Sequence, residues 1–97
     1  YSAAHPSAKN KAYVAAFGKA NAGMRPNFMS VGGYDGMHVI YEALKKTNGN
    51  TDGDVLLAAM KGLAFESPRG PVSIDAGTRD ITQTIYLRKV EKADGEP

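Results

Sequence analysis

The spacing of apolar residues follows a helical period in the first part of the chain and an alternating one near its end. In residues 7–20, Tyr13 and Phe17 lie one helical turn apart on one face, and most of the lysines lie on the other. Ser7 opens this stretch, and a serine hydroxyl can accept a hydrogen bond from an unpaired backbone N–H in the first turn of a helix. The pattern predicts a first helix over residues 7–20.

Residues 27–49 are the stretch on which we expect the rest of the chain to pack. A brief apolar run followed by Gly32 and Gly33 predicts a short buried strand and a turn, after which helical spacing returns. Gly49 can take the left-handed conformation that ends a helix. The strand residues are Phe28, Met29 and Val31, and the helical face carries Met37, Ile40, Tyr41 and Leu44. The prediction is one unit of strand, glycine turn and amphipathic helix.

Later in the chain the pattern predicts a third helix and a β-hairpin. Asp52 and Asp54 supply a cap and early negative charge for a helix whose length Gly62 limits. Prolines and glycines then interrupt two β-prone runs. The expected elements are a loop over residues 65–71, strands over 71–75 and 81–90, and a turn over 75–80.

The last expected strand carries apolar side chains on both faces. Ile81, Ile85 and Leu87 face one way, whereas Tyr86 and Val90 face the other. Such a strand needs cover on both sides, which a chain of 97 residues would struggle to provide. We therefore expect the isolated chain to self-associate through its C-terminal strand.

Composition and charge narrow the class of protein. With 42% apolar residues, 97 residues suffice for one modest core. The net charge of +2 is too weak to indicate a nucleic-acid partner, and the lack of cysteine excludes disulfides, thiolate metal sites and cysteine nucleophiles. There is no apolar run of the roughly 20 residues that span a bilayer, and no signal-peptide pattern. Because the chain begins with Tyr1 rather than Met, we expect it to be processed or a piece of a longer protein.

Glycines between a strand and a helix are typical of phosphate-binding loops. Aligned on the dinucleotide fingerprint G-x-G-x-x-G, Gly33 and Gly36 fill the last two positions, but Val31 stands where the first glycine makes the tight turn. The same glycines match the G-x-x-G loop of KH domains, but Asp35 inside it would repel a phosphate. Glycines that let a strand and a helix approach closely are the favoured interpretation, and a phosphate-binding enzyme stays an alternative.

Metal and catalytic sites have little support in the sequence. His38 and Glu42 lie four residues apart on the expected central helix, where both can touch one metal, but no third ligand stands at a compatible spacing. A Ser-His-Asp triad would need Ser30, Asp35 and a histidine to meet, and no serine lies in a nucleophile elbow. The sequence predicts no metal, no cofactor and no catalytic residue.

Asp35 and its neighbours have both a structural and a ligand-binding interpretation. Asp35, expected in the first turn of the central helix, can stabilise the positive helix end or pair with an ammonium group of a ligand. Phe28, Met29 and Tyr34 suit a core or a ligand pocket. Ligands of open α/β sheets bind beyond the carboxyl ends of the strands, where we expect residues 29–35 to lie.

Several short motifs, taken in order, carry a resemblance to a known family. They are residues 1–6, then Asn10-Lys11-Ala12-Tyr13-Val14, Arg25-Pro26-Asn27-Phe28, Gly33-Tyr34-Asp35-Gly36-Met37-His38 and Ala43-Leu44-Lys45-Lys46, followed by residues 65–75 and 85–90. In this order and spacing the chain resembles the C-terminal third of periplasmic substrate-binding proteins of ABC transporters. The closest group is the branched-chain amino-acid-binding, or type I, family, and the resemblance covers nearly the whole chain.

The resemblance implies a fragment of a two-lobed α/β fold. Proteins of this family have two α/β lobes joined by three crossing strands, with the ligand in the cleft between them. On this basis residues 1–78 belong to the N-terminal lobe, which the chain enters through a crossing segment at 1–6, and residues 79–97 are the strand that returns to the C-terminal lobe. The expected content is about three helices, a short buried strand and a C-terminal β-hairpin.

The same resemblance implies a function without catalysis. The whole protein would be the periplasmic solute-binding component of an ABC importer, capturing an amino acid or a similar small carboxylate by hinge closure. Its partners would be that ligand and the membrane subunits of the transporter. Matched onto this chain, the expected ligand-binding residues are Phe28, Met29 and Ser30 at the cleft, with Tyr34 and Asp35 at the helix start. The alternative is a ligand-sensing domain of a receptor or regulator with the same fold.

Overall fold

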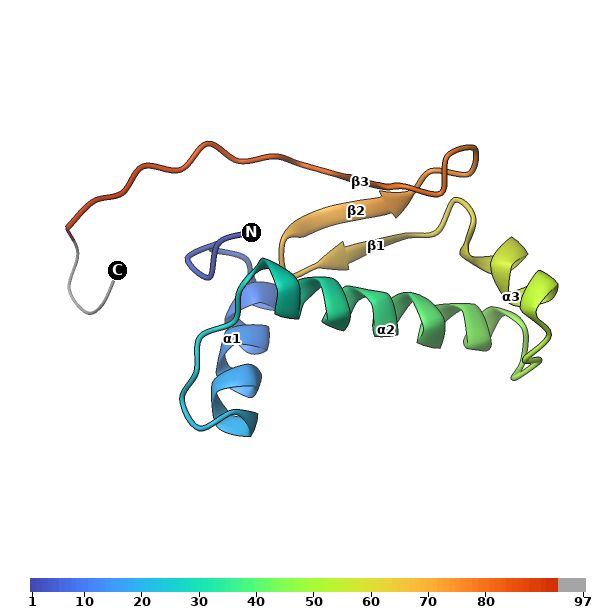
Figure 1. Ribbon diagram of the computed structural model, residues 1–97, viewed down its shortest axis with the longest axis horizontal. Coiled ribbons are helices and arrows are strands. Elements are labelled where there is room, and N and C mark those ends of the chain that lie inside the picture. Colours follow the sequence, from blue (N-terminus) through green and yellow to red (C-terminus); the bar gives the residue numbers. More distant parts are fainter. Residues whose placement is uncertain (93–97) are drawn as a thin grey trace.

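The computed structural model describes residues 1–92 and shows three helices beside one three-stranded sheet (Figure 1). The helices are α1 (Ala8–Ala20), α2 (Phe28–Lys46) and α3 (Gly53–Met60), and the strands are β1 (Ala64–Ser67), β2 (Gly70–Ile74) and β3 (Ile81–Gln83). The central strand, β2, pairs antiparallel with both β1 and β3. Figure 1 shows α2 running along the sheet, with α1 near its N-terminal end and α3 near its C-terminal end.

The first helix confirms the prediction and holds the segment that precedes it. Ser7 is the N-cap of α1, and its hydroxyl accepts a hydrogen bond from the backbone N–H of Asn10 at 3.1 Å. The fully buried Asn10 side chain donates to the carbonyl oxygens of Ala3 and His5 at 2.9 and 2.8 Å, and it accepts from the Tyr1 hydroxyl at 2.6 Å. Residues 1–6 are therefore fastened to α1 by one side chain.

The expected strand and glycine turn at the start of the central unit are wrong. Residues 28–33 are the first turns of α2, because the Asn27 side chain accepts from the backbone N–H groups of Met29 and Ser30 while the Ser30 hydroxyl accepts from that of Asn27. This reciprocal cap satisfies N–H groups that are otherwise unpaired at a helix start. Phe28 and Met29 are 67% and 72% exposed, so they form no buried run.

The expected position of Asp35 is also wrong. The carboxylate lies in the middle of α2 and is 2% exposed, on the face that also buries Val31 and Ala43. It therefore does not contact the unpaired N–H groups at the positive helix end. The predicted stop of this helix is confirmed, because Gly49 takes a φ of +83° and its N–H donates to the Leu44 carbonyl.

The third helix and the hairpin are confirmed in outline and corrected in detail. Asp52 caps α3 by accepting from the N–H groups of Asp54 and Val55, and the Asp75 carboxylate organises the turn between β2 and β3. The loop expected at 65–71 is instead strand β1 and a tight turn, an element that the sequence pattern did not predict.

The last strand is much shorter than predicted. It ends at Gln83, and within the described part of the chain residues 84–92 join no strand ladder. In Figure 1 this stretch leaves the sheet and runs back toward the N-terminus. Ile85 is 81% exposed and Leu87 fully so, which leaves one of the two predicted apolar faces open among the described residues, whereas Tyr86 on the other face packs on His5. The final residues of the expected strand to the other lobe, 93–97, lie outside the described part.

Candidate functional site

A buried ion pair joins the middle of α2 to the turn between β1 and β2. Arg69 Nε donates to Asp35 Oδ2 at 2.8 Å, and the Ser67 hydroxyl donates to the same oxygen at 2.7 Å. The two charged side chains are only 16% and 3% exposed. Charge-assisted hydrogen bonds of this kind are short and directional, so they fix the guanidinium in one orientation.

The rest of the guanidinium reaches the neighbouring strand. Arg69 Nη1 donates to Gln83 Oε1 at 3.2 Å, which ties the turn to the end of β3. We call Asp35, Ser67, Arg69 and Gln83 the Arg69 corner. Asp35 Oδ1 is buried and has no hydrogen-bond partner among the described residues. Asp35 Oδ2 therefore accepts both of the hydrogen bonds that this carboxylate receives there, from Ser67 and Arg69.

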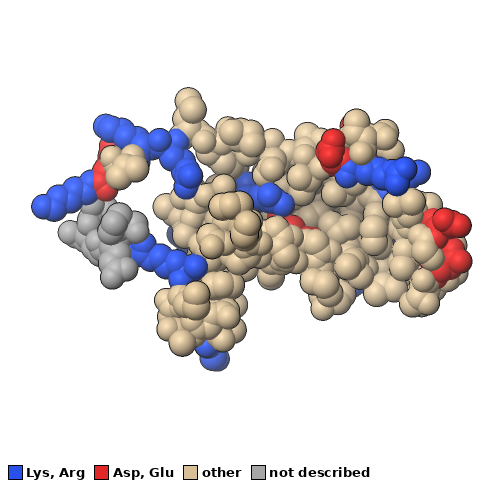
Figure 2. Space-filling view, viewed as in Figure 1, with Lys and Arg blue, Asp and Glu red and all other residues tan. Residues whose placement is uncertain are grey.

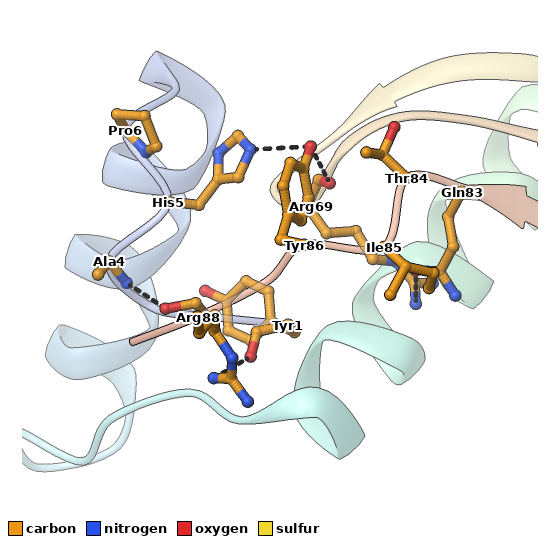
Figure 3. Close-up of a pocket in the computed structure, with 11 residues that line it drawn as sticks. Tyr1, Ala4, His5, Pro6, Arg69, Gln83, Thr84, Ile85, Tyr86 and Arg88 are labelled. Atoms are coloured by element: carbon orange, nitrogen blue, oxygen red, sulfur yellow. Dashed lines mark hydrogen bonds between the residues drawn. The ribbon is translucent and has the colours of Figure 1, made fainter. Parts of the chain in front are cut away.

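A pocket of about 400 Å³ lies beside the corner, between the first and the last described segments of the chain (Figure 3). Residues 1–6 form one side of it and residues 83–88 the other, and Arg69 contributes from the turn. The volume suits a small organic molecule. The labelled lining residues are Tyr1, Ala4, His5, Pro6, Arg69, Gln83, Thr84, Ile85, Tyr86 and Arg88.

The polar groups of the pocket are mainly hydrogen-bond donors. Arg69 and Arg88 carry guanidinium groups, and Gln83 turns its oxygen toward Arg69, which leaves its NH₂ group for other partners. Among residues 1–92, the lining includes no carboxylate, and the Asp35 carboxylate is paired with Arg69. Apolar surface comes from Ile85 and the tyrosine rings. The arrangement favours a ligand with an anionic group and an apolar body.

The charges of the whole molecule are spread rather than concentrated at this pocket. On the face in Figure 2, most basic side chains lie toward the end that holds the last described segment and most acidic ones toward the end where α3 lies, but each end also carries charge of the other sign. The net charge is only +2. Long-range attraction of an anion is therefore weak, and recognition depends on the donors that line the pocket.

The predicted site residues lie near the pocket but do not line it. Ser30 accepts a hydrogen bond from the Tyr13 hydroxyl at 2.9 Å, and the Tyr34 ring lies 4.7 Å from the Tyr13 ring. Tyr13 in turn contacts Tyr1, a lining residue, edge to face at 6.3 Å. Phe28 and Met29 point to solvent, and Asp35 acts on the pocket only through Arg69.

The lining residues that the sequence did not single out come mostly from the end of the chain. Arg69 and Tyr86 lay within the quoted family motifs but had no predicted role, and Gln83 and Arg88 had none either. One signal was available: a carboxylate four residues from Val31 lies on the apolar face of a helix, and a buried carboxylate needs a cationic partner. It does not say which of the basic residues that partner is.

Tyr1 is the lining residue whose acidity changes. Burial, with a smaller contribution from the neighbouring Tyr13, raises the pKa of Tyr1 from 10.0 to about 12. Its hydroxyl thus stays protonated and continues to donate to Asn10 at any physiological pH. This bond keeps the Tyr1 ring at the edge of the pocket.

The histidine and glutamate of α2 have ordinary surface roles. The His38 ring packs on Phe65 with ring centres 4.7 Å apart, and Glu42 accepts a hydrogen bond from Lys45 at 3.1 Å, which lowers the pKa of Glu42. Within residues 1–92, no group of three His, Asp or Glu side chains lies together as a metal site would require. No helix in that range is long and apolar enough to cross a membrane.

Comparison with known proteins gives the family. Residues 1–96 match the family model described as periplasmic binding protein. A curated relative, "Leu/Ile/Val-binding protein homolog 6" of Brucella abortus, is 48% identical over 95 residues, which are 97% of this chain and 24% of that protein. The chain belongs to the periplasmic binding protein family, as the motifs indicated.

Solved structures agree in fold as well as in sequence. A solute-binding protein of an ABC transporter from Rhodopseudomonas palustris BisB5, in complex with 3,4-dihydroxybenzoic acid, is 67% identical with a TM-score of 0.94 over 98% of this chain and 26% of that one. A second, from R. palustris HaA2 with p-hydroxybenzoic acid, is 46% identical with a TM-score of 0.87 over 97% of this chain and 26% of that one. The chain thus spans about a quarter of the length of these proteins, and its fold is a fragment of the periplasmic binding protein fold. The family and these relatives are described as binding proteins, in line with the expected function without catalysis.

Proposed function

We propose that the whole protein containing this chain is the periplasmic solute-binding component of an ABC importer. It captures a small carboxylate, either an aromatic hydroxy acid or an amino acid, by closing two lobes around it. Similar proteins support this class of ligand, since two of them are solved with hydroxybenzoic acids and another is named for branched-chain amino acids. The membrane subunits of the transporter are the partners that recognise the closed form.

The observation that carries the proposal is the pocket between the two ends of the described chain. Arg69, Gln83 and Arg88 line a space of about 400 Å³ together with Ile85 and tyrosine rings, a size and composition that suit a carboxylate on a small ring or aliphatic body. Residues 1–6 and 84–88 would cross between the lobes here, and the pocket would open toward the lobe that this chain lacks.

The division of the chain follows from the same proposal. Residues 1–78 belong to the N-terminal lobe, entered through residues 1–6, and residues 79–97 return to the C-terminal lobe. The departure of residues 84–92 from the sheet supports the return of that stretch to the other lobe, whereas residues 81–83 still pair with β2. Phe28, Met29, Ser30 and Tyr34 do not line the pocket of this chain, and in the proposal they contact the ligand only when the rest of the two-lobed protein is present. Asp35 belongs to the site as the residue that holds Arg69.

A chimera tests the proposed function directly. This chain replaces the matching quarter of the R. palustris BisB5 protein, and calorimetry measures binding of 3,4-dihydroxybenzoate, 4-hydroxybenzoate and leucine. We expect binding of at least one carboxylate at about micromolar concentrations, with the unaltered BisB5 protein as the control. A folded chimera that binds none of them contradicts the proposal.

The isolated chain is the second arm of this test. It lacks the opposite lobe, so it should bind the same compounds far more weakly than the chimera does. Micromolar binding by the monomeric isolated chain would show that closure of two lobes is unnecessary.

We also propose that the isolated chain self-associates through residues 81–90, which light scattering at several concentrations can measure. The exposed Ile85 and Leu87 side chains support this.

A sensor domain of a receptor or regulator is the second candidate, because the same fold would serve it equally well. The gene that encodes the whole protein distinguishes the two. A DNA-binding or membrane-spanning segment joined to the lobes favours the sensor, and a secretion signal beside a transporter operon favours the importer.

A further inference from the structure

Two segments at opposite ends of the described chain lie side by side and are joined at two points. The His5 ring packs edge to face on the Tyr86 ring at 5.1 Å, with Nε2 3.2 Å from the Tyr86 hydroxyl. Arg88 Nη1 donates to the Tyr1 carbonyl at 3.0 Å. Because Tyr1 meets Arg88 and His5 meets Tyr86, the two segments run in opposite directions (Figure 3).

The hydrogen bonds of this contact form a directed chain. The backbone N–H of Ser7 donates to His5 Nδ1 at 3.3 Å, so in the neutral ring the proton is on Nε2. Nε2 then donates to the Tyr86 hydroxyl, which donates to the Arg69 carbonyl at 3.3 Å. One tyrosine hydroxyl thus connects the first segment, the last segment and the turn of the Arg69 corner.

Gly70 makes room for that hydroxyl. A Cβ at position 70 would stand 2.5 Å from the Tyr86 oxygen, closer than van der Waals contact allows. Gly70 also has a φ of +98°, which side-chain-bearing residues rarely adopt. The turn is therefore shaped for Tyr86 in both space and backbone conformation.

The contact involves segments that other side chains hold in place, whereas the described chain beyond Arg88, residues 89–92, is exposed. Asn10 fastens residues 1–6 to α1, and the Arg69 side chain is held by Asp35 and Gln83. Beyond Tyr86, Leu87 is fully exposed and Val90 is 92% exposed. The boundary between the supported and the unsupported chain therefore falls near Arg88.

We propose that Tyr86, His5 and Gly70 form an anchor that fixes both inter-lobe segments to this lobe. When the lobes close, bending then takes place beyond Arg88 and not within residues 84–88. This inference rests on the proposed function, since it assigns residues 1–6 and 84–88 to the hinge. Tyr86 is a positioning residue in it: the anchor restricts the open protein to few lobe orientations, which reduces the entropy lost on closure.

The anchor can be tested without any ligand in the isolated chain, at concentrations at which light scattering shows that the chain is monomeric. Because the chain has no cysteine, A4C and L87C place two spin labels specifically, and pulsed electron resonance gives the distance between them. We expect one narrow distance that is lost in Tyr86→Phe and in Gly70→Ala. Tyr41→Phe, on exposed α2, is the matched control and should keep it. An unchanged narrow distance in Tyr86→Phe overturns the anchor.

Ligand binding in the chimera gives a second, separable readout. Tyr86→Phe removes one hydroxyl and keeps the ring, so the chimera should remain folded and bind about 3- to 10-fold more weakly, the size of one net hydrogen bond. The distribution of distances between labels on the two lobes should also broaden without ligand. A chimera that never binds contradicts the proposed function, whereas one that binds equally well with Tyr86→Phe contradicts only the anchor.

Discussion

The side chains of the Arg69 corner have their partners within this chain, whereas those on the outer face of α2 are largely exposed. In the corner, a carboxylate that is 2% exposed has a cation and a hydroxyl at 2.8 and 2.7 Å. The outer face, which we define as Met29, Gly33, Met37 and Ile40, is apolar but open: its large side chains are 72%, 47% and 38% exposed. One face of α2 is therefore buried by other residues of this chain, and the other face is not.

The contrast between the paired corner and the exposed outer face shows which contacts of α2 are made within this chain. A buried charge requires a counter-charge at once, since an unpaired one is very costly, and Asp35 Oδ2 has both a cation and a hydroxyl group as partners, from Arg69 and Ser67. Apolar surface tolerates exposure at a smaller cost for each residue. A Cβ added at Gly33 or Gly36 would meet nothing within 4 Å, so the outer face has space for a further layer. We expect the rest of the lobe to cover it.

The largest expected effect is loss of the buried ion pair. Asp35→Ala leaves Arg69 without its counter-charge and should destabilise the isolated chain by on the order of 3 kcal/mol, a large part of the total for a chain of this size. Urea unfolding followed by circular dichroism measures it. Glu42→Ala, which removes an exposed carboxylate from the same helix, is the control and should change little.

A double variant shows what kind of contribution the pair makes. Asp35→Leu with Arg69→Met replaces both charges by apolar groups and should recover much of the stability lost in Asp35→Ala. If Asp35→Ala and Glu42→Ala lower stability equally, the buried ion pair contributes no more than a surface carboxylate, and the contrast between the corner and the exposed face of α2 is wrong.

A substitution on the outer face of α2 should become costly only when the rest of the fold is present, whereas one on the buried face should already be costly in the isolated chain. In the isolated chain Val31→Ala, on the fully buried face, should cost about 2 kcal/mol, while Met37→Ala on the outer face stays within about 0.5 kcal/mol. In the chimera, Met37→Ala should become costly, at about 2 kcal/mol. Urea unfolding of these three variants, with the unsubstituted chain and the unsubstituted chimera as references, measures this. An outer-face substitution that stays neutral in the chimera means that the face remains uncovered there.

Local signals in the sequence predicted much of the fold. Ser7 and Asp52 start helices, Gly49 ends one and Asp75 makes a turn, and each acts on backbone groups within three to five residues. The expected strand at the start of α2 failed for the same kind of reason. Asn27 and Ser30 form a reciprocal cap that outweighs the brief apolar run, although it lacks the usual Glu or Gln.

The candidate site depends on partners that no local pattern connects. Asp35 and Arg69 are 34 residues apart, and His5 and Tyr86 are 81 apart. The sequence shows that a carboxylate lies on an apolar helix face, but any of the basic residues could be its partner. Family motifs included the pieces, Arg69 and Tyr86 among them, yet only the packing of the hairpin beside residues 1–6 brings them to one pocket.

The smallest expected effect is the pH dependence of stability that comes from Tyr1, at the start of the packed part of the chain. Its pKa rises from 10.0 to about 12 on folding, so the folded state favours the protonated hydroxyl. The resulting stability is complete below pH 10 and is lost as the pH rises from about 10 through about 12. Because Tyr1 is only partly buried, solvent screening keeps the loss small.

Urea midpoints of the native chain and of Tyr1→Phe, measured from pH 9 to pH 12.5, isolate this contribution, since all other groups titrate in both. The native chain should lose stability relative to Tyr1→Phe across that window. Tyr41→Phe, which removes an exposed hydroxyl, should follow the native chain. If the difference in urea midpoint between the native chain and Tyr1→Phe is constant with pH, the Tyr1 hydroxyl is not bound to Asn10 in solution. The packed part of the chain would then begin at α1.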